Sequence, residues 1–171
     1  MRRAKRLAVV FAVLSTTVLI GAAPAGAGQG ATQVSGSTDF VACPGGPGDW
    51  ATPDYAFHIS GDLDGCVYGL VSDARCHPSG VYQEVADEIF VDDDSGDTFE
   101  MTEFFWAKYE FDVPCDFDTI TAQVFGGCKH PIVTGTGTGE YDGVTGRLDF
   151  KDDVDTGLAD YKGHLRGIEL S

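Results

Sequence analysis

The chain of 171 residues carries 27 acidic side chains against 11 basic ones, a formal net charge of -16 at pH 7. A charge of this sign repels nucleic acid and anionic membrane surfaces, so we expect neither as a partner. The length suits one domain with a substantial core, and we interpret the acidic excess as a well-solvated surface.

The first 27 residues have the composition of a secretory signal peptide. Four basic residues are followed by an apolar run over 7–20, which is short for a membrane-spanning helix. Ala25-Gly26-Ala27 then offers a cleavage site of the A-x-A type. We predict that 1–27 is a signal peptide and that the protein is secreted, extracellular and not anchored in a membrane.

Residues 28–53 are rich in Gly, Ser, Thr, Ala and Pro, with the run Pro44-Gly45-Gly46-Pro47-Gly48 in the middle. Such a composition is typical of a flexible lead-in. We therefore predict a flexible N-terminal segment over 28–53 and a folded domain over 54–171.

From Tyr55 to Val71 apolar and polar residues alternate, which indicates β-structure. Two structures fit this pattern. One is a long strand bent at Gly61 and Gly65, and the other is a hairpin that turns at Asp64-Gly65. We favour the bent strand because the alternation never breaks.

The remainder of the chain predicts further strands. We expect a long hairpin of 80–91 and 98–111, a strand over 118–125, a break at Gly126-Gly127, and a strand from 132 to 138. A last hairpin joins 147–154 to 158–170. No segment has a helical period, and seven or eight strands at this spacing predict an all-β protein. A single antiparallel barrel would also remove the exposed edges of such long strands.

The stretch from Gly135 to Gly146 holds five glycines in twelve residues, interleaved with Thr, Tyr and Val. We predict strand, tight corner, strand, with the glycines allowing the sheet to bend and close. A phosphate-binding loop would need a following helix, and 147–150 alternates like a strand, so we exclude that function.

This glycine-rich stretch, the following Arg147-Leu148-Asp149-Phe150 and the final segment 161–170 resemble the last hairpins of the allene oxide cyclase-like and dirigent-like barrels. The segments 61–66 and 127–132 also resemble parts of secreted actinobacterial proteins of unassigned function. The resemblance covers most of 55–170 and implies a small calycin-type barrel. It implies cofactor-independent cyclisation or isomerisation as one activity. No catalytic acid or arginine of those families maps onto this chain by motif.

Five cysteines in an exported chain predict disulfides that staple the domain. Proximity in sequence favours Cys66–Cys76 and Cys115–Cys128, which leaves Cys43 unpaired. Four cysteines still allow three connectivities. The chain has no C-x-x-C motif, and its four histidines have no metal-binding spacing. We therefore predict no cofactor and no metal site, since only the fold could assemble one.

The strand 98–111 carries the candidate chemistry. Its more apolar side should face the lumen of a small barrel, and Phe99, Met101, Phe105 and Tyr109 are our candidates for ligand binding. Glu103 lies on the same side. A carboxylate among aromatic residues has a raised pKa and is a candidate general acid or base. Alternatively, a bulge turns Glu103 to water.

The strand 80–91 has polar residues on both sides. Gln83 and Asp87 interrupt Val81, Val85 and Ile89, and if they point inward they could form an acid/base site with Glu103. A simpler explanation is cross-strand pairing with Lys108, Lys162 or Arg166. The opposite side is equally mixed, so the pattern leaves open which side faces the lumen: Tyr82, Glu84, Ala86, Glu88 and Phe90.

Three functions follow from these expectations. The first is a secreted barrel that binds a small apolar or aromatic molecule in its lumen, without assigned catalysis. The second is a cyclase or isomerase that uses Glu103 with Asp87 or Gln83. The third is a structural or interaction protein of the cell envelope. An open pocket that holds Glu103 and a second polar group within hydrogen-bond reach supports the second function, and a lumen packed solid with Phe and Tyr side chains excludes the first two.

Overall fold

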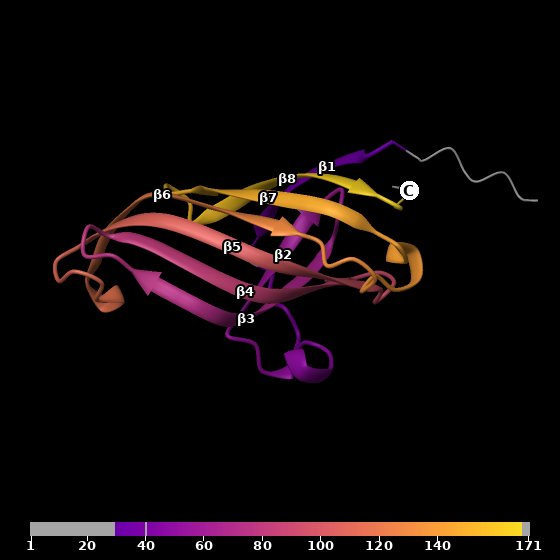
Figure 1. The fold of residues 1–171 in the computed structure, drawn as a ribbon, viewed down its shortest axis with the longest axis horizontal. Helices are drawn as coiled ribbons and strands as arrows, with labels where there is room; N and C mark the ends of the chain where they lie inside the picture. Colours follow the sequence, from indigo (N-terminus) through magenta and orange to yellow (C-terminus); the bar gives the residue numbers. More distant parts are fainter. Residues whose placement is uncertain (1–29, 40, 169–171) are drawn as a thin grey trace, which may run out of the picture.

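The computed structural model describes residues 30–39 and 41–168 and shows an all-β protein. Eight antiparallel strands close into a barrel in chain order, and the last strand is hydrogen-bonded to the first (Figure 1). The predicted antiparallel barrel is therefore confirmed, with eight strands. The predicted signal peptide over 1–27 lies outside the described residues.

The elements follow one another with mostly short connections. The strands are β1 (Thr32–Asp39), β2 (Tyr55–Gly61), β3 (Gly65–Cys76), β4 (Val81–Asp92), β5 (Thr98–Phe111), β6 (Ile120–Pro131), β7 (Thr145–Asp153) and β8 (Leu158–Arg166). Three short 3-10 turns are η1 (Gly48–Ala51), η2 (Phe117–Thr119) and η3 (Gly139–Tyr141). Within the ranges given above, no helix is long and apolar enough to cross a membrane.

Two predicted hairpins are present. β4 and β5 pair continuously from Val81 opposite Lys108 to Val91 opposite Thr98. β7 and β8 form the last hairpin around the acidic turn at 154–157. In both, Asp and Gly occupy the turn, where Asp side chains bond to nearby backbone amides and Gly adopts a positive φ.

The prediction of a flexible segment over 28–53 is wrong for the part that the structure describes. β1 lies between β2 and β8 and pairs with both, so the barrel begins at Thr32 rather than at 54. Small polar residues fit here because the backbone supplies the ladder and only Val34 is deeply buried. Gly36 is required, since a Cβ there would overlap the ring of Tyr161.

Residues 41–54 pack against the outside of the barrel. Cys43 is disulfide-bonded to Cys66, and Trp50 packs with Tyr68 and Ile89. Figure 1 shows η1 on the outer side of β3. The proline- and glycine-rich composition therefore describes an irregular but anchored connection.

Residues 55–71 form a hairpin, so the predicted bent strand is wrong. β2 ends at Gly61, the chain turns over 62–64, and Ile59 pairs with Gly65. Gly61 has a φ of 130°, a conformation that side-chain-bearing residues rarely adopt. The alternation continues across the turn because the strands on both sides each have one face toward the core.

β6 runs through Gly126-Gly127 without a break, contrary to the prediction. The two glycines do not end the strand. They allow a neighbouring strand to approach closely. A Cβ at Gly126 would overlap the carboxylate of Asp152, and one at Gly127 would meet the carbonyl oxygen of Phe150 at 2.8 Å.

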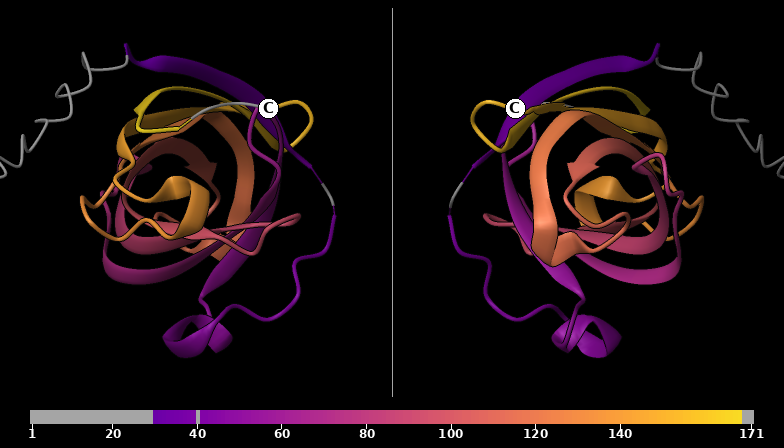
Figure 2. Two further views of the ribbon diagram at one scale, coloured as in Figure 1. Left: turned by 90° about the vertical axis from the view of Figure 1, so that its right-hand side faces the viewer. Right: turned by 90° about the vertical axis from the view of Figure 1, so that its left-hand side faces the viewer.

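Residues 135–144 of the glycine-rich stretch form a loop with the short turn η3, and the predicted strand over 132–138 is absent. Figure 2 (left) shows this segment lying across one end of the barrel. The Tyr141 ring packs on Phe90 and Phe99, and its hydroxyl donates to Asp92 at 2.8 Å. The stretch therefore closes the barrel as a lid of side chains, and β7 begins only at Thr145.

The two ends of the barrel differ. We call the end with the β2–β3, β4–β5 and β6–β7 connections the closed end, and the opposite end the open end. Side chains fill the lumen at the closed end, where the Tyr161 hydroxyl also bonds to the backbone of Leu63. The filling side chains include Val34, Ile59, Leu63, Val67, Phe90, Phe99, Met101, Tyr141, Val144, Leu148, Tyr161, Leu165 and Ile168.

The disulfides join Cys43 to Cys66 and Cys76 to Cys115, while Cys128 is unpaired and buried. The predicted pairs Cys66–Cys76 and Cys115–Cys128 are wrong. Cys66 and Cys76 lie at opposite ends of β3, so about 33 Å of extended strand separates them. Cys128 points into the barrel, away from Cys115 in the β5–β6 connection.

Candidate functional site

The lumen at the open end is a cavity of about 650 Å³. Aromatic side chains form part of its wall, and two of the predicted ligand-binding residues, Phe105 and Tyr109, belong to it. The other two, Phe99 and Met101, lie in the closed half and do not line the cavity. The aromatic wall comprises Tyr55, Phe57, Tyr82, Phe105, Tyr109 and Phe150.

Glu103 lies at the floor of this cavity, where the filled half of the barrel begins. The alternation of β5 points it inward, and it is 6% exposed. No bulge interrupts the pairing of β4 with β5, so the alternative that turned Glu103 to water is wrong. Tyr55 of β2 also lines the cavity, whereas Glu88 of β4 and His130 of β6 lie behind the floor and are fully buried.

Gln83 and Asp87 are exposed on the outer face of β4, so they do not join Glu103. The opposite, equally mixed face points inward and contributes Glu84 at the cavity wall and Glu88 deeper in. The register explains this choice, because Glu88 pairs with Gly69 and Met101, whose positions face the lumen.

One tyrosine hydroxyl contacts both buried carboxylates. Tyr55 Oη lies 2.7 Å from Glu103 Oε2 and 2.9 Å from Glu88 Oε1. A hydroxyl has a single proton to donate, so it donates to one carboxylate at a time. The second short contact becomes a hydrogen bond when that carboxyl group is protonated and donates to the tyrosine oxygen.

Gly69 creates the space for this hydroxyl. Tyr55 pairs with Gly69 across β2 and β3, and a Cβ at that position would overlap the tyrosine ring. The ring therefore lies close over the β3 backbone and projects its hydroxyl toward Glu88, which is the next cross-strand neighbour of Gly69.

His130 and Glu88 are both fully buried and form a close pair. His130 Nδ1 lies 2.5 Å from Glu88 Oε2. The His130 ring also packs on Phe150, with ring centroids 4.6 Å apart. Burial disfavours the imidazolium, but the charge and hydrogen bond of Glu88, together with the charges of Glu103 and Asp149, raise the pKa of His130.

Burial raises the pKa of Glu103 to about 7, and the Glu88 charge adds to this effect. The hydrogen bond from Tyr55 and the charge of His130 act in the opposite direction. Glu103 therefore exchanges its proton near neutral pH, as a general acid or base must.

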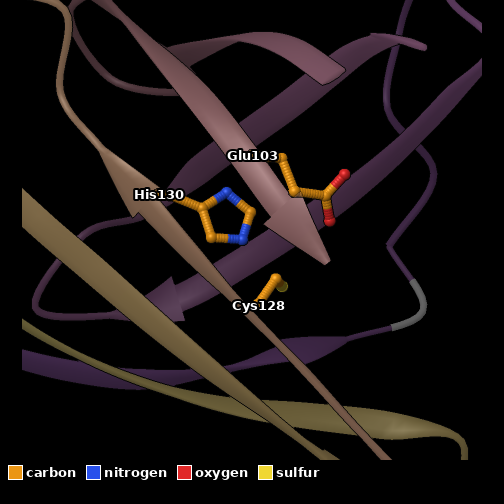
Figure 3. Close-up of side chains that lie close together, drawn as sticks. All are labelled: Glu103, Cys128 and His130. Atoms are coloured by element: carbon orange, nitrogen blue, oxygen red, sulfur yellow. The ribbon is translucent and has the colours of Figure 1, made fainter. Parts of the chain in front are cut away.

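Cys128 lies beside this group, two residues before His130 on the inward face of β6. Figure 3 shows Glu103, Cys128 and His130 converging from β5 and β6. One ligand atom from each lies within 4.8 Å of the other two. Burial raises the pKa of the Cys128 thiol, and the charges of Glu103 and Glu88 act in the same direction.

The rim of the cavity is acidic. Asp39, Glu84, Asp152 and Asp153 line its mouth, and no Lys or Arg of the described residues does so. Burial raises the pKa of Asp152, although Gln123 donates a hydrogen bond to its carboxylate. The cavity therefore favours neutral or cationic molecules over anions.

Three residues at or behind the floor were missed by sequence reasoning: Tyr55, Glu88 and His130. The spacing of Cys128 and His130 was a usable signal, because residues two apart on a strand face the same side. The predicted break at Gly126-Gly127 ended the strand before these two residues, so their shared side was not recognised. Nothing in the sequence pattern places Tyr55 or Glu88 near Glu103, since that requires the register of three strand pairs.

Comparison with protein-family models, with curated proteins and with solved structures gives no match to this chain. The resemblance to the allene oxide cyclase-like and dirigent-like barrels therefore stays a prediction.

Proposed function

We propose that this protein is a secreted barrel that binds one small aromatic or apolar molecule, neutral or cationic, in the open half of its lumen. The observation that carries the proposal is the cavity of about 650 Å³ in a barrel whose other half is filled. Small-molecule sites typically measure about 300–1,000 Å³ and combine apolar walls with a few polar groups.

The wall and the floor of the cavity suit two parts of such a ligand. Tyr82, Phe105 and Tyr109 offer ring faces for stacking on a flat molecule. At the floor, Glu103 offers a hydrogen-bond acceptor through the carboxylate oxygen that Tyr55 does not contact. A ligand with an aromatic body and a hydroxyl or amino group at one end fits both parts.

Two fluorescent probes with the same ring system test the cavity and its charge preference. Aminoanthracene is neutral, and anthracene sulfonate is anionic. We expect the first to bind with a fluorescence increase and the second to bind at least about ten-fold more weakly, since each factor of ten requires only about 1.4 kcal/mol. Equal binding of both would contradict the charge argument.

A blocking variant locates the binding site. Ala159 lines the cavity, so Ala159→Phe should fill it and abolish binding of aminoanthracene. Ala122 pairs with Glu110 on the exposed face of β6, and Ala122→Phe adds the same side chain outside the barrel. Binding that survives Ala159→Phe would refute the lumen as the site.

A second candidate is a cofactor-independent cyclase or isomerase, as the resemblance to allene oxide cyclase-like barrels implies. It is favoured by the Tyr55–Glu103 hydrogen bond at the floor of an accessible cavity. Native mass spectrometry of the protein from its host would identify a bound molecule. If that molecule is a substrate, Glu103→Gln should abolish turnover. In a binding protein the same variant should only change affinity.

A further inference from the structure

We propose that Glu103, Cys128 and His130 form a binding site for a Zn²⁺-type cation at the floor of the cavity. The three side chains are 6%, 7% and 0% exposed and come from two adjacent strands. Their ligand atoms lie within 4.8 Å of one another (Figure 3). Binding of a small aromatic molecule in the cavity does not depend on this metal site.

The two nitrogens of His130 have different environments. Nδ1 is occupied by Glu88, whereas Nε2 is buried and has no hydrogen-bond partner among the described residues. A buried polar atom without a partner is rare and energetically costly. When Nδ1 carries the proton and donates it to Glu88, Nε2 presents a lone pair, which is the form that binds a metal.

Glu88 and Tyr55 act as positioning residues for this site. A metal-binding histidine usually donates its other N–H to a carboxylate, which orients the ring and increases its basicity. Glu88 is placed for this role, at 2.5 Å from Nδ1. Tyr55 similarly holds Glu103 through Oε2, so the second carboxylate oxygen is available to a cation.

The charge balance also favours a cation. Two buried carboxylates face one imidazole, and no Lys or Arg in the described ranges forms a salt bridge with either carboxylate. Buried charges require compensation by a partner or a metal. Zn²⁺ binding would add a divalent charge, while the Cys128 thiol, and His130 Nε2 when the ring is protonated, lose their protons to the buffer as the Zn–S and Zn–N bonds form.

The ligand set selects the type of metal. Zn²⁺ commonly binds thiolate, imidazole and carboxylate ligands. Mg²⁺ and Ca²⁺ require oxygen ligands, so a site with one sulfur and one nitrogen ligand disfavours them. Tetrahedral zinc holds its ligand atoms roughly 3.5 Å apart, which small side-chain movements reach from the observed separation. Because Glu103 and Cys128 line the cavity, a fourth position would be accessible from it.

A second histidine cluster serves as an internal comparison. His58 lies near Asp64 and Asp93, and its ligand atoms meet the same distance criterion. Both ring nitrogens of His58 already contact carboxylates, Nδ1 with Asp39 and Nε2 with Asp93. It therefore has no free nitrogen, and we assign it no metal.

The test is a cobalt titration of the protein with both disulfides intact, after treatment with a chelator. Cobalt bound to a thiolate gives a charge-transfer absorption in the near ultraviolet. Four of the five cysteines are in disulfides, so this absorption reports Cys128 alone. We expect one equivalent of Co²⁺ to produce it and Zn²⁺ to displace it.

Four variants identify the ligands. Cys128→Ser should abolish the absorption, and His130→Gln and Glu103→Gln should each weaken affinity by more than about 100-fold. Glu88→Gln, which changes only the orienting partner, should weaken it about 10–100-fold. His58→Gln is the matched control and should leave both the absorption and the affinity unchanged. Near-ultraviolet circular dichroism verifies the fold of each variant.

Absence of the thiolate absorption in the wild-type protein would overturn the proposal, as would unchanged affinity in Glu103→Gln. The near-isosteric Glu103→Gln also decides the question if Cys128→Ser does not fold. Aminoanthracene binding is measured separately in chelator-treated protein. Failure of the metal site and failure of the proposed ligand binding are therefore distinguishable.

Discussion

At the scale of single residues, the floor of the cavity places two carboxylates around one hydroxyl and one imidazole. Glu103, Tyr55, Glu88 and His130 form a continuous chain of short contacts from the cavity into the core. In a low-dielectric interior such a network is strong when every member has a partner and costly when one is missing. Its members should therefore be sensitive to substitutions that remove a single atom.

Tyr55→Phe removes only the hydroxyl that bridges the two carboxylates. We expect the free energy of unfolding to fall by about 1–3 kcal/mol, because both carboxylates lose a buried partner. Urea denaturation measures this change. Tyr109 also faces the cavity, but its hydroxyl forms no hydrogen bond to the described residues, so Tyr109→Phe should cost less than about 0.5 kcal/mol. Equal effects of the two variants would contradict the bridging role.

The alternation of its strand put Glu103 on the lumen side in one of the two placements that the sequence left open, and it put Phe105 and Tyr109 on the cavity wall for the same reason. It failed at Gln83 and Asp87, where both faces of the strand are equally mixed. Which face of that strand points into the barrel depends on which of its cross-strand neighbours point into the barrel. Only the complete strand register determines this orientation.

At the scale of elements, the formation of strands β1 and β2 depends on pairing with other strands, which the local residue pattern does not reveal. β1 is held by backbone pairing with two strands, one of them at the far end of the sequence. The hairpins β4–β5 and β7–β8 were predictable because their partners are adjacent in sequence and joined by Asp/Gly turns. The lid formed by 135–146 was not, since its glycines fit a corner equally well.

His58 connects three separate segments on the outer face of the barrel. Its ring contacts Asp39 of β1, Asp64 of the β2–β3 turn and Asp93 of the β4–β5 turn. Burial opposes the charged form, but the hydrogen bonds and the charges of Asp93 and Asp39 together raise the pKa of His58. The charged ring thus stabilises the folded state.

Because the folded-state pKa of His58 is above the unfolded value, its contribution is complete below about pH 6.5 and declines as the pH rises through the folded-state pKa. His58→Gln should therefore lower the free energy of unfolding by about 1–3 kcal/mol at acidic pH and by less at alkaline pH. Urea denaturation across this range gives the difference. His164 is exposed, and His164→Gln is the control that should change the free energy of unfolding by less than about 0.5 kcal/mol. A constant difference for His58→Gln would refute the assignment.

At the scale of the whole molecule, the disulfides fix irregular connections to the barrel. Cys43–Cys66 attaches the 41–54 segment to β3, and Cys76–Cys115 joins the end of β3 to the β5–β6 connection. Sequence proximity could not predict these pairs, because an extended strand carries neighbouring cysteines far apart and antiparallel pairing brings distant ones together. The number of two disulfides and one free thiol was predictable from the odd count.

Thiol alkylation tests this connectivity. Cys128 is buried, so the folded protein should resist iodoacetamide. Under denaturing conditions without reductant, one equivalent should react, and peptide mapping should locate it at Cys128. Reduction first should expose all five cysteines. A label at Cys43 would instead support the pairing predicted from sequence.

The filled closed end and the hollow open end divide each long strand into two parts with separate duties. On β5, Phe99 and Met101 belong to the filled part, and Phe105 and Tyr109 belong to the wall of the hollow part. Substitutions in the wall can therefore alter what is recognised while the residues that hold the barrel together stay the same. Such a chain can acquire new ligands by changes at its mouth alone, which makes it a suitable scaffold for evolution or engineering of binding.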